Sequence, residues 1–242
     1  MAIFTEENSH KLRIQSGEAA TFRAAVLLLA MVLIVFTAVP GEAQQGIGNL
    51  GNPGVIPPNA TRTYEELSAQ WWQWSFSLPV AGHPFLECPV PSDAGQAGPV
   101  WFLAGQFGTS ECEISVPPGK RLFFPLVNAE CSSLEDPPFY GGTAEEQRDC
   151  AQGWADGIDE TQLFCEIDGA PVQNLASYRF VSPQFRFTAP TPWIFGTTGG
   201  IGTAVGDGYY LLLAPLSPGS HTIHFGNPAF GIDTTYHLTV AP

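Results

Sequence analysis

Positively charged side chains are scarce in this sequence. Its 242 residues include 9 Lys and Arg against 23 Asp and Glu, which gives a formal net charge of −14 with histidine neutral. A surface of this sign repels the phosphates of nucleic acids and the head groups of anionic lipids. The composition therefore predicts neither a nucleic-acid partner nor an anionic membrane surface as partner.

The local signatures of several enzyme classes are also missing. The chain contains no G-x-S-x-G nucleophile elbow, no H-E-x-x-H zinc motif, no G-x-x-x-x-G-K-[ST] phosphate loop and no EF-hand loop. It has no C-x-x-C pair either, which argues against a zinc knuckle or a dithiol redox site. The sequence thus leaves enzymatic activity uncertain and identifies no catalytic residue.

The beginning of the chain predicts export. Residues 24–38 form an uninterrupted apolar run of the length of a signal-peptide core, and Lys11, Arg13 and Arg23 precede it. We expect residues 1–43 to be a signal peptide, with an uncleaved anchor as the alternative. The predicted location is secreted or periplasmic, with no membrane association after cleavage.

The rest of the chain predicts one β-rich domain. Residues 44–62 are rich in Gly, Pro and Asn, as expected of a flexible tether, and residues 63–242 follow as a single domain. In 234–240 apolar and polar residues alternate, and 209–213 and 220–225 are similar short runs ended by Gly and Pro. This pattern predicts a mainly β fold, an antiparallel sandwich of immunoglobulin-like or jelly-roll-like type.

Two helices and one further hairpin are expected within this domain. Capping boxes at Thr63–Glu66 and Thr143–Glu146 predict helix starts, and the first is followed by apolar residues at helical spacing. The segments 112–116 and 121–127 flank a Pro-Gly turn, and we expect them to pair as a hairpin. The sandwich should therefore carry one or two short packed helices.

All 5 cysteines follow the predicted signal peptide. Disulfides persist in exported proteins, and although spacing does not determine connectivity, we expect the pairs Cys88–Cys112 and Cys131–Cys150, each closing a loop-rich segment. Cys165 lies in an apolar run, so we expect it to be a buried free thiol.

Histidines near the carboxyl terminus suggest a metal site. If the last two strands form a hairpin centred near residues 230–231, His224 and His237 face each other on the outer side of the sheet. Two imidazoles at that separation can bind copper or zinc, with His83 or Glu130 as a further ligand. The alternative is that these histidines form hydrogen bonds with neighbouring side chains.

Tryptophans suggest a different kind of site. Trp72, Trp154 and Trp193 are candidates for stacking on sugar rings, whereas the alternative places them in the core. The functional hypotheses are therefore an exported binding or interaction module of unknown ligand, a copper- or zinc-dependent extracytoplasmic enzyme, and a carbohydrate-active or carbohydrate-binding protein. The corresponding partners are a protein or a polysaccharide.

Several segments together also suggest a family. The segments YEELSAQWWQW, GPVWFLAG and HTIHFG, following a signal peptide, resemble an uncharacterised group of exported bacterial β-rich proteins. The resemblance covers most of the exported part of the chain. It implies export and a β-rich fold, and it implies no activity.

Overall fold

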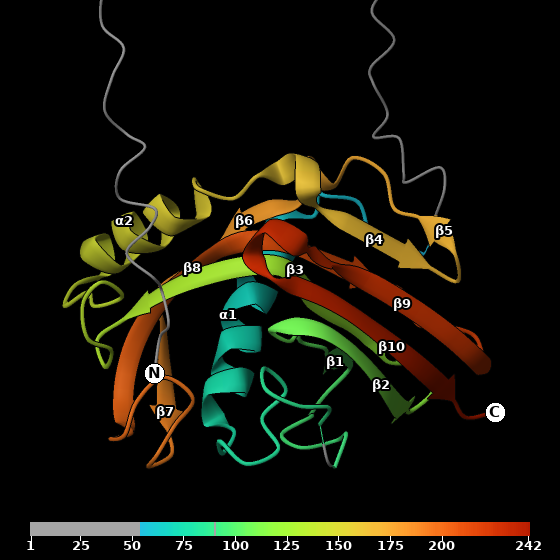
Figure 1. Ribbon diagram of the computed structural model, residues 1–242, viewed down its shortest axis with the longest axis horizontal. Helices are drawn as coiled ribbons and strands as arrows, with labels where there is room; N and C mark the ends of the chain where they lie inside the picture. Colours follow the sequence, from blue (N-terminus) through green and yellow to red (C-terminus); the bar gives the residue numbers. More distant parts are fainter. Residues whose placement is uncertain (1–53, 90) are drawn as a thin grey trace, which may run out of the picture. The chain divides into compact units, whose positions relative to one another are not determined.

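The computed structural model describes residues 54–89 and 91–242 (Figure 1). The predicted signal peptide, 1–43, and most of the predicted tether lie outside these residues. Within them, none of the helices has the length and apolar character needed to cross a membrane.

The described residues form a mainly β fold with two sheets of five strands each. The first sheet contains β1 (Val100–Phe102), β3 (Arg121–Ser132), β8 (Gly200–Leu213), β6 (Arg179–Val181) and β7 (Phe185–Ala189). The second contains β10 (Ile232–Val240), β9 (Gly219–Asn227), β4 (Phe164–Ile167) and β5 (Ala170–Pro171), with β2 (Gly108–Val116) alongside β10. Strand β8 is central to the first sheet because it pairs with β3, β6 and β7.

Strand pairing agrees with some of the sequence predictions and corrects others. The last two strands, β9 and β10, form the expected antiparallel hairpin. The pair β1–β3 is parallel, unlike the others, so the fold is not purely antiparallel. The predicted hairpin between 112–116 and 121–127 is wrong, because β2 belongs to the second sheet and β3 to the first. The Pro-Gly turn, with φ of 78° at Gly119, connects the two sheets instead.

Both predicted helices are present. Helix α1 (Thr61–Ser77) begins two residues before the predicted box, and its N-cap, Ala60, makes no side-chain cap. Glu66 instead pairs with Arg62 at 2.8 Å. Helix α2 (Ala144–Ala155) begins with the predicted capping box of Thr143 and Glu146. Short 3-10 turns occur at Glu160–Gln162, Leu175–Tyr178 and Pro228–Phe230.

The two helices contact opposite faces of the first sheet (Figure 1). On one face the Trp72 indole of α1 packs over β8, where a Cβ added to Gly206 would lie 2.3 Å from Trp72 Nε1. Only glycine leaves room for the indole there. On the other face α2 is tied to β3 by the disulfide Cys131–Cys150. The disulfide Cys88–Cys112 is also present and Cys165 is free and buried, so the cysteine predictions are confirmed.

The described end of the predicted tether packs on the domain. Val55 is buried and forms an antiparallel bridge with Leu213 of β8, and the Ile56 N–H donates to the Leu212 carbonyl at 2.8 Å. The folded domain therefore begins before residue 63, the boundary predicted from the sequence. The Gly and Pro residues of this stretch predict a flexible tether, but backbone hydrogen bonds fix its described end against β8.

Replacement of Tyr64 by Phe tests the attachment of α1 and this segment. The Tyr64 hydroxyl donates to the Ile56 carbonyl at 2.6 Å and accepts from the Leu212 N–H at 3.2 Å. Y64F leaves both buried groups unpaired, so we expect the free energy of unfolding to fall by about 2–3 kcal/mol in urea titrations. Y236F is the matched control, because the Tyr236 hydroxyl has one backbone partner, the Ala104 carbonyl at 2.9 Å. An equal or smaller loss in Y64F would contradict this assignment.

Candidate functional site

The structure does not pair His224 with His237. In the β9–β10 hairpin His224 lies opposite Thr235, and His237 lies opposite Thr222. The expected register is wrong because the side chain of Asn227 accepts a hydrogen bond from the Ala229 N–H at 3.1 Å and so caps the 3-10 turn. This cap places the centre of the turn one residue earlier than assumed.

Each of these histidines has a carboxylate partner instead. His224 Nε2 lies 2.7 Å from Asp233 Oδ1, and His237 Nε2 lies 2.6 Å from Glu111 Oε1. These contacts correspond to the alternative in which the histidines form hydrogen bonds with neighbours. Among residues 54–89 and 91–242, His, Cys, Asp and Glu form no group of three or more that could hold a metal ion.

His83, a suggested additional ligand, is buried beside α1. The Phe85 N–H donates to His83 Nδ1 at 3.2 Å, so Nε2 carries the ring proton and donates it to the Ser75 carbonyl at 3.0 Å. Burial of the ring lowers the pKa of His83 to about 4. Both ring nitrogens are therefore occupied by protein groups.

Of the three candidate tryptophans, two are in the core. Trp72 and Trp193 are 3% and 2% exposed, whereas Trp154 is 39% exposed. The Trp72 indole N–H donates to the Tyr210 hydroxyl at 3.2 Å, and the Trp193 ring contacts Phe76 and Phe187. Trp154 is thus the candidate that remains open to a ligand.

Trp154 is part of an exposed aromatic surface. Its ring stacks on Phe139 with centroids 4.8 Å apart and an interplanar angle of 19°. Tyr140, next to Phe139, is 52% exposed. We call Phe139, Tyr140 and Trp154 the Trp154 surface.

The backbone around the Trp154 surface is well anchored. The Ser132 N–H donates to the Phe139 carbonyl at 3.0 Å, and the Gly141 N–H donates to the Ser132 carbonyl at 2.9 Å. The disulfide Cys131–Cys150 joins the end of β3 to α2, which carries Trp154. The aromatic rings therefore project from a cross-linked part of the fold.

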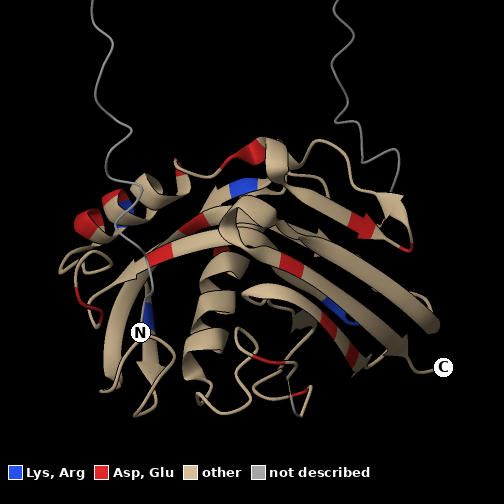
Figure 2. Ribbon diagram, in the orientation of Figure 1, with Lys and Arg blue, Asp and Glu red and all other residues tan. Residues whose placement is uncertain are grey.

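Helix α2, which carries Trp154, also carries several acidic residues. Figure 2 shows acidic residues along α2, where Glu145, Asp149 and the C-cap residue Asp156 are exposed. Glu146 is already engaged, since its Oε2 accepts hydrogen bonds from the backbone N–H groups of residues 142 and 143 at 2.8 and 3.1 Å. The exposed Asp149 carboxylate of α2 offers a hydrogen-bond acceptor, whereas Asp156 is paired with Arg179 at 2.6 Å.

Two carboxyl groups, one on β3 and one in the loop that follows it, influence each other. Glu130 on β3 is 4% exposed, and its Oε2 has no hydrogen-bond partner among the described residues. Burial raises the pKa of Glu130 well above its usual range. The negative charge of Glu135 and a hydrogen bond with Glu135 raise it further. Burial also raises the pKa of Glu135, whose Oε2 accepts from the Ser132 hydroxyl at 2.9 Å. Glu130 had been predicted as a metal ligand, but the ionisable group that acts on it is another acid, Glu135, in the loop that follows β3.

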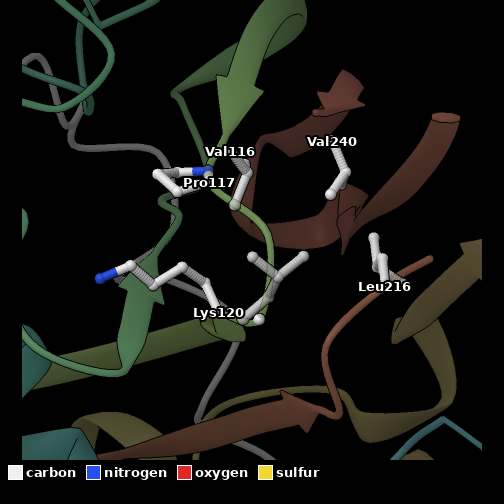
Figure 3. A pocket seen from close by; sticks show the side chains of 7 residues that line it. Val116, Pro117, Lys120, Leu216 and Val240 are labelled. Atoms are coloured by element: carbon white, nitrogen blue, oxygen red, sulfur yellow. The ribbon is translucent and has the colours of Figure 1, made fainter. Parts of the chain in front are cut away.

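A small recess elsewhere lacks the polar groups of a reactive site (Figure 3). It is lined by Val116, Pro117, Gly119, Lys120, Leu122, Leu216 and Val240. Lys120 is the charged residue among these, and Figure 3 shows its ammonium directed away from the apolar side chains. We therefore place the candidate site at the Trp154 surface.

Acid should destabilise the protein through His83. Below pH 6.5 the unfolded chain takes up a proton at this residue, whereas the folded chain does so only near pH 4. Stability is thus lost as the pH falls from 6.5 to 4, by at most about 3 kcal/mol. H83Q removes this titration, so urea unfolding at pH 7 and pH 4 should show a smaller acid-induced loss in H83Q than in the wild type. The same loss in both proteins would contradict a neutral buried His83.

Comparison with known proteins assigns no family to the chain. No protein-family model, no curated protein and no solved structure matches it. The functional argument therefore depends on the residues of this fold.

Proposed function

We propose that the chain is an exported β-sandwich binding module whose ligand is a neutral polysaccharide that stacks on Trp154. The observation that carries this proposal is the partly exposed Trp154 ring, stacked on Phe139 at 4.8 Å. A large exposed aromatic ring supported from behind offers a flat apolar surface with little conformational entropy to lose on binding.

The chemistry of a sugar fits this surface. A pyranose ring has an apolar C–H face that can cover an indole, and hydroxyl groups at its edge that can donate to a carboxylate such as Asp149. The net charge of −14 disfavours anionic polymers, so we expect a neutral glycan. The disulfide Cys131–Cys150 supports a preorganised surface and suits an extracytoplasmic location.

A binding role is better supported than the two catalytic alternatives. A copper or zinc enzyme would need His224 and His237 to leave Asp233 and Glu111 and converge. A glycosidase would need two carboxyl groups on either side of a bound sugar. Of the pair Glu130 and Glu135, Glu130 is buried in the first sheet, so the two offer no such arrangement.

Replacement of Trp154 tests the proposal directly. The mature protein should be retained by at least one of insoluble cellulose, chitin and xylan in a pull-down assay. W154A should weaken binding to that polymer about tenfold or more, equivalent to about 1.4 kcal/mol, because the stacking surface is lost.

F107A is the matched control. Phe107 is a more exposed aromatic residue, at 69%, and it lies before β2 in contact with the second sheet. Its replacement should leave polymer binding unchanged. Equal binding by W154A and the wild type, or no retention on any neutral polysaccharide, would refute the proposal.

A further inference from the structure

Glu130 is positioned where an ionised carboxylate is poorly accommodated. It lies opposite Gly206 of β8, on the face of the first sheet that α1 covers. The neighbouring donors, the Trp72 indole and the Asn128 amide, both donate to the Tyr210 hydroxyl. Glu130 Oε2 is therefore left without a donor from the described residues.

Glu135 is the acidic neighbour of Glu130. It belongs to the segment 133–143 between β3 and α2, is partly exposed, and lies close enough to Glu130 to raise the pKa of that carboxyl through its charge and a hydrogen bond. No Lys, Arg or His in the described part of the chain forms an ion pair with either residue. The other titratable groups near Glu130 are the Tyr210 hydroxyl and, more remotely, Asp207, which is engaged by Arg179. Two carboxylates in contact without a cation require a proton between them.

We propose that Glu130 keeps its proton and donates a hydrogen bond to Glu135, and that loss of this proton to solvent releases the loop that carries Phe139 and Tyr140 of the Trp154 surface. In the protonated state the Glu130 carboxyl is the donor and Glu135 is the acceptor, and Glu135 also accepts from Ser132. The pair thereby attaches the loop to β3, next to the Ser132–Phe139 backbone contact.

Deprotonation affects the two residues differently. Glu130 is enclosed by β8 and α1 and cannot reach water without opening the core. Glu135 is partly exposed, so repulsion between the two charges is relieved when Glu135 swings into solvent and leaves Ser132. The segment that holds Phe139 and Tyr140 then loses one of its attachments.

The direction of the pH effect follows from proton linkage. In the folded state the pKa of Glu130 is raised, so the folded chain holds a proton that the unfolded chain has already lost. The resulting stabilisation is complete at acidic pH and disappears as the pH rises through the folded-state pKa. We expect weaker attachment of the loop in alkaline solution. Only the consequence for ligand binding rests on the proposed polysaccharide function.

The test uses the mature protein and the variant E130Q. The amide that this substitution introduces can still donate to Glu135 but cannot titrate. Between pH 5 and pH 10 the wild type should lose at least about 4 °C of Tm relative to E130Q. Hydrogen exchange, corrected for the intrinsic effect of pH, should show lower protection of segment 133–143 at high pH in the wild type and no such loss in E130Q.

Two further variants make the outcome decisive. E135Q removes the like charge and supplies an amide donor, so the transition should move to lower pH; this variant also tests the proposal if E130Q does not fold. E145Q, at an exposed carboxylate of α2, should behave as the wild type.

A pH profile shared by the wild type and E130Q would overturn the proposal. So would a rise in the Tm of the wild type with millimolar Ca²⁺ that E130Q abolishes, because a cation rather than a proton would then bridge the pair.

Polymer binding by the same proteins separates this inference from the proposed function. If both hold, the wild type should release the polysaccharide in the alkaline range and E130Q should retain it. A pH transition without any polymer binding would reject the polysaccharide and leave the shared proton intact. Polymer binding without the transition would reject the shared proton alone.

Discussion

The packing of α1 against β8 is the contact on which the rest of the fold depends. The Trp72 indole occupies the space that the absence of a side chain at Gly206 leaves, and the Tyr64 hydroxyl pairs with the backbone of β8 and of residue 56. Because β8 pairs with three other strands, this contact positions the whole first sheet. It also covers the face on which Glu130 lies.

The indole N–H groups of α1 show how a helix so rich in tryptophan can be buried. Trp71, Trp72 and Trp74 donate to the Leu103 carbonyl, the Tyr210 hydroxyl and the Ala94 carbonyl at 2.7, 3.2 and 3.0 Å. The helix is enclosed by the sheet and by the segment that contains Ala94, so its aromatic residues are buried on more than one side. Every partnered N–H avoids the cost of an unsatisfied buried donor.

The opposite side of the first sheet carries aromatic rings at the surface instead of enclosing them in the core. There a disulfide and a few backbone hydrogen bonds hold a loop and α2 together, and the rings of Phe139 and Trp154 stack at the surface. The buried acid Glu130 lies on the α1 side of the sheet, two residues before the end of β3, after which this loop begins. A titratable group in the core and part of an exposed aromatic surface are thus joined by a single short segment of chain.

The sequence by itself determined the features that depend on neighbouring residues. Capping at Thr143, the helical spacing of Tyr64 and Trp71, the alternation in β10 and the mainly β class are local patterns, and the structure contains them. Both expected disulfides are present, although the order of the cysteines along the chain did not determine the pairing.

Only the tertiary structure decided which residues lie side by side across the fold. The capped turn at Asn227 set the register that separates His224 from His237, because alternation fixes the face of a residue but not its cross-strand partner. Likewise, the helical pattern could not show that Trp72 would meet a glycine of β8 while Trp154 stays exposed, since burial depends on distant segments. The contact between Glu130 and Glu135 depends on the path of the loop after β3, and the spacing of two acids along the chain gives no sign of it.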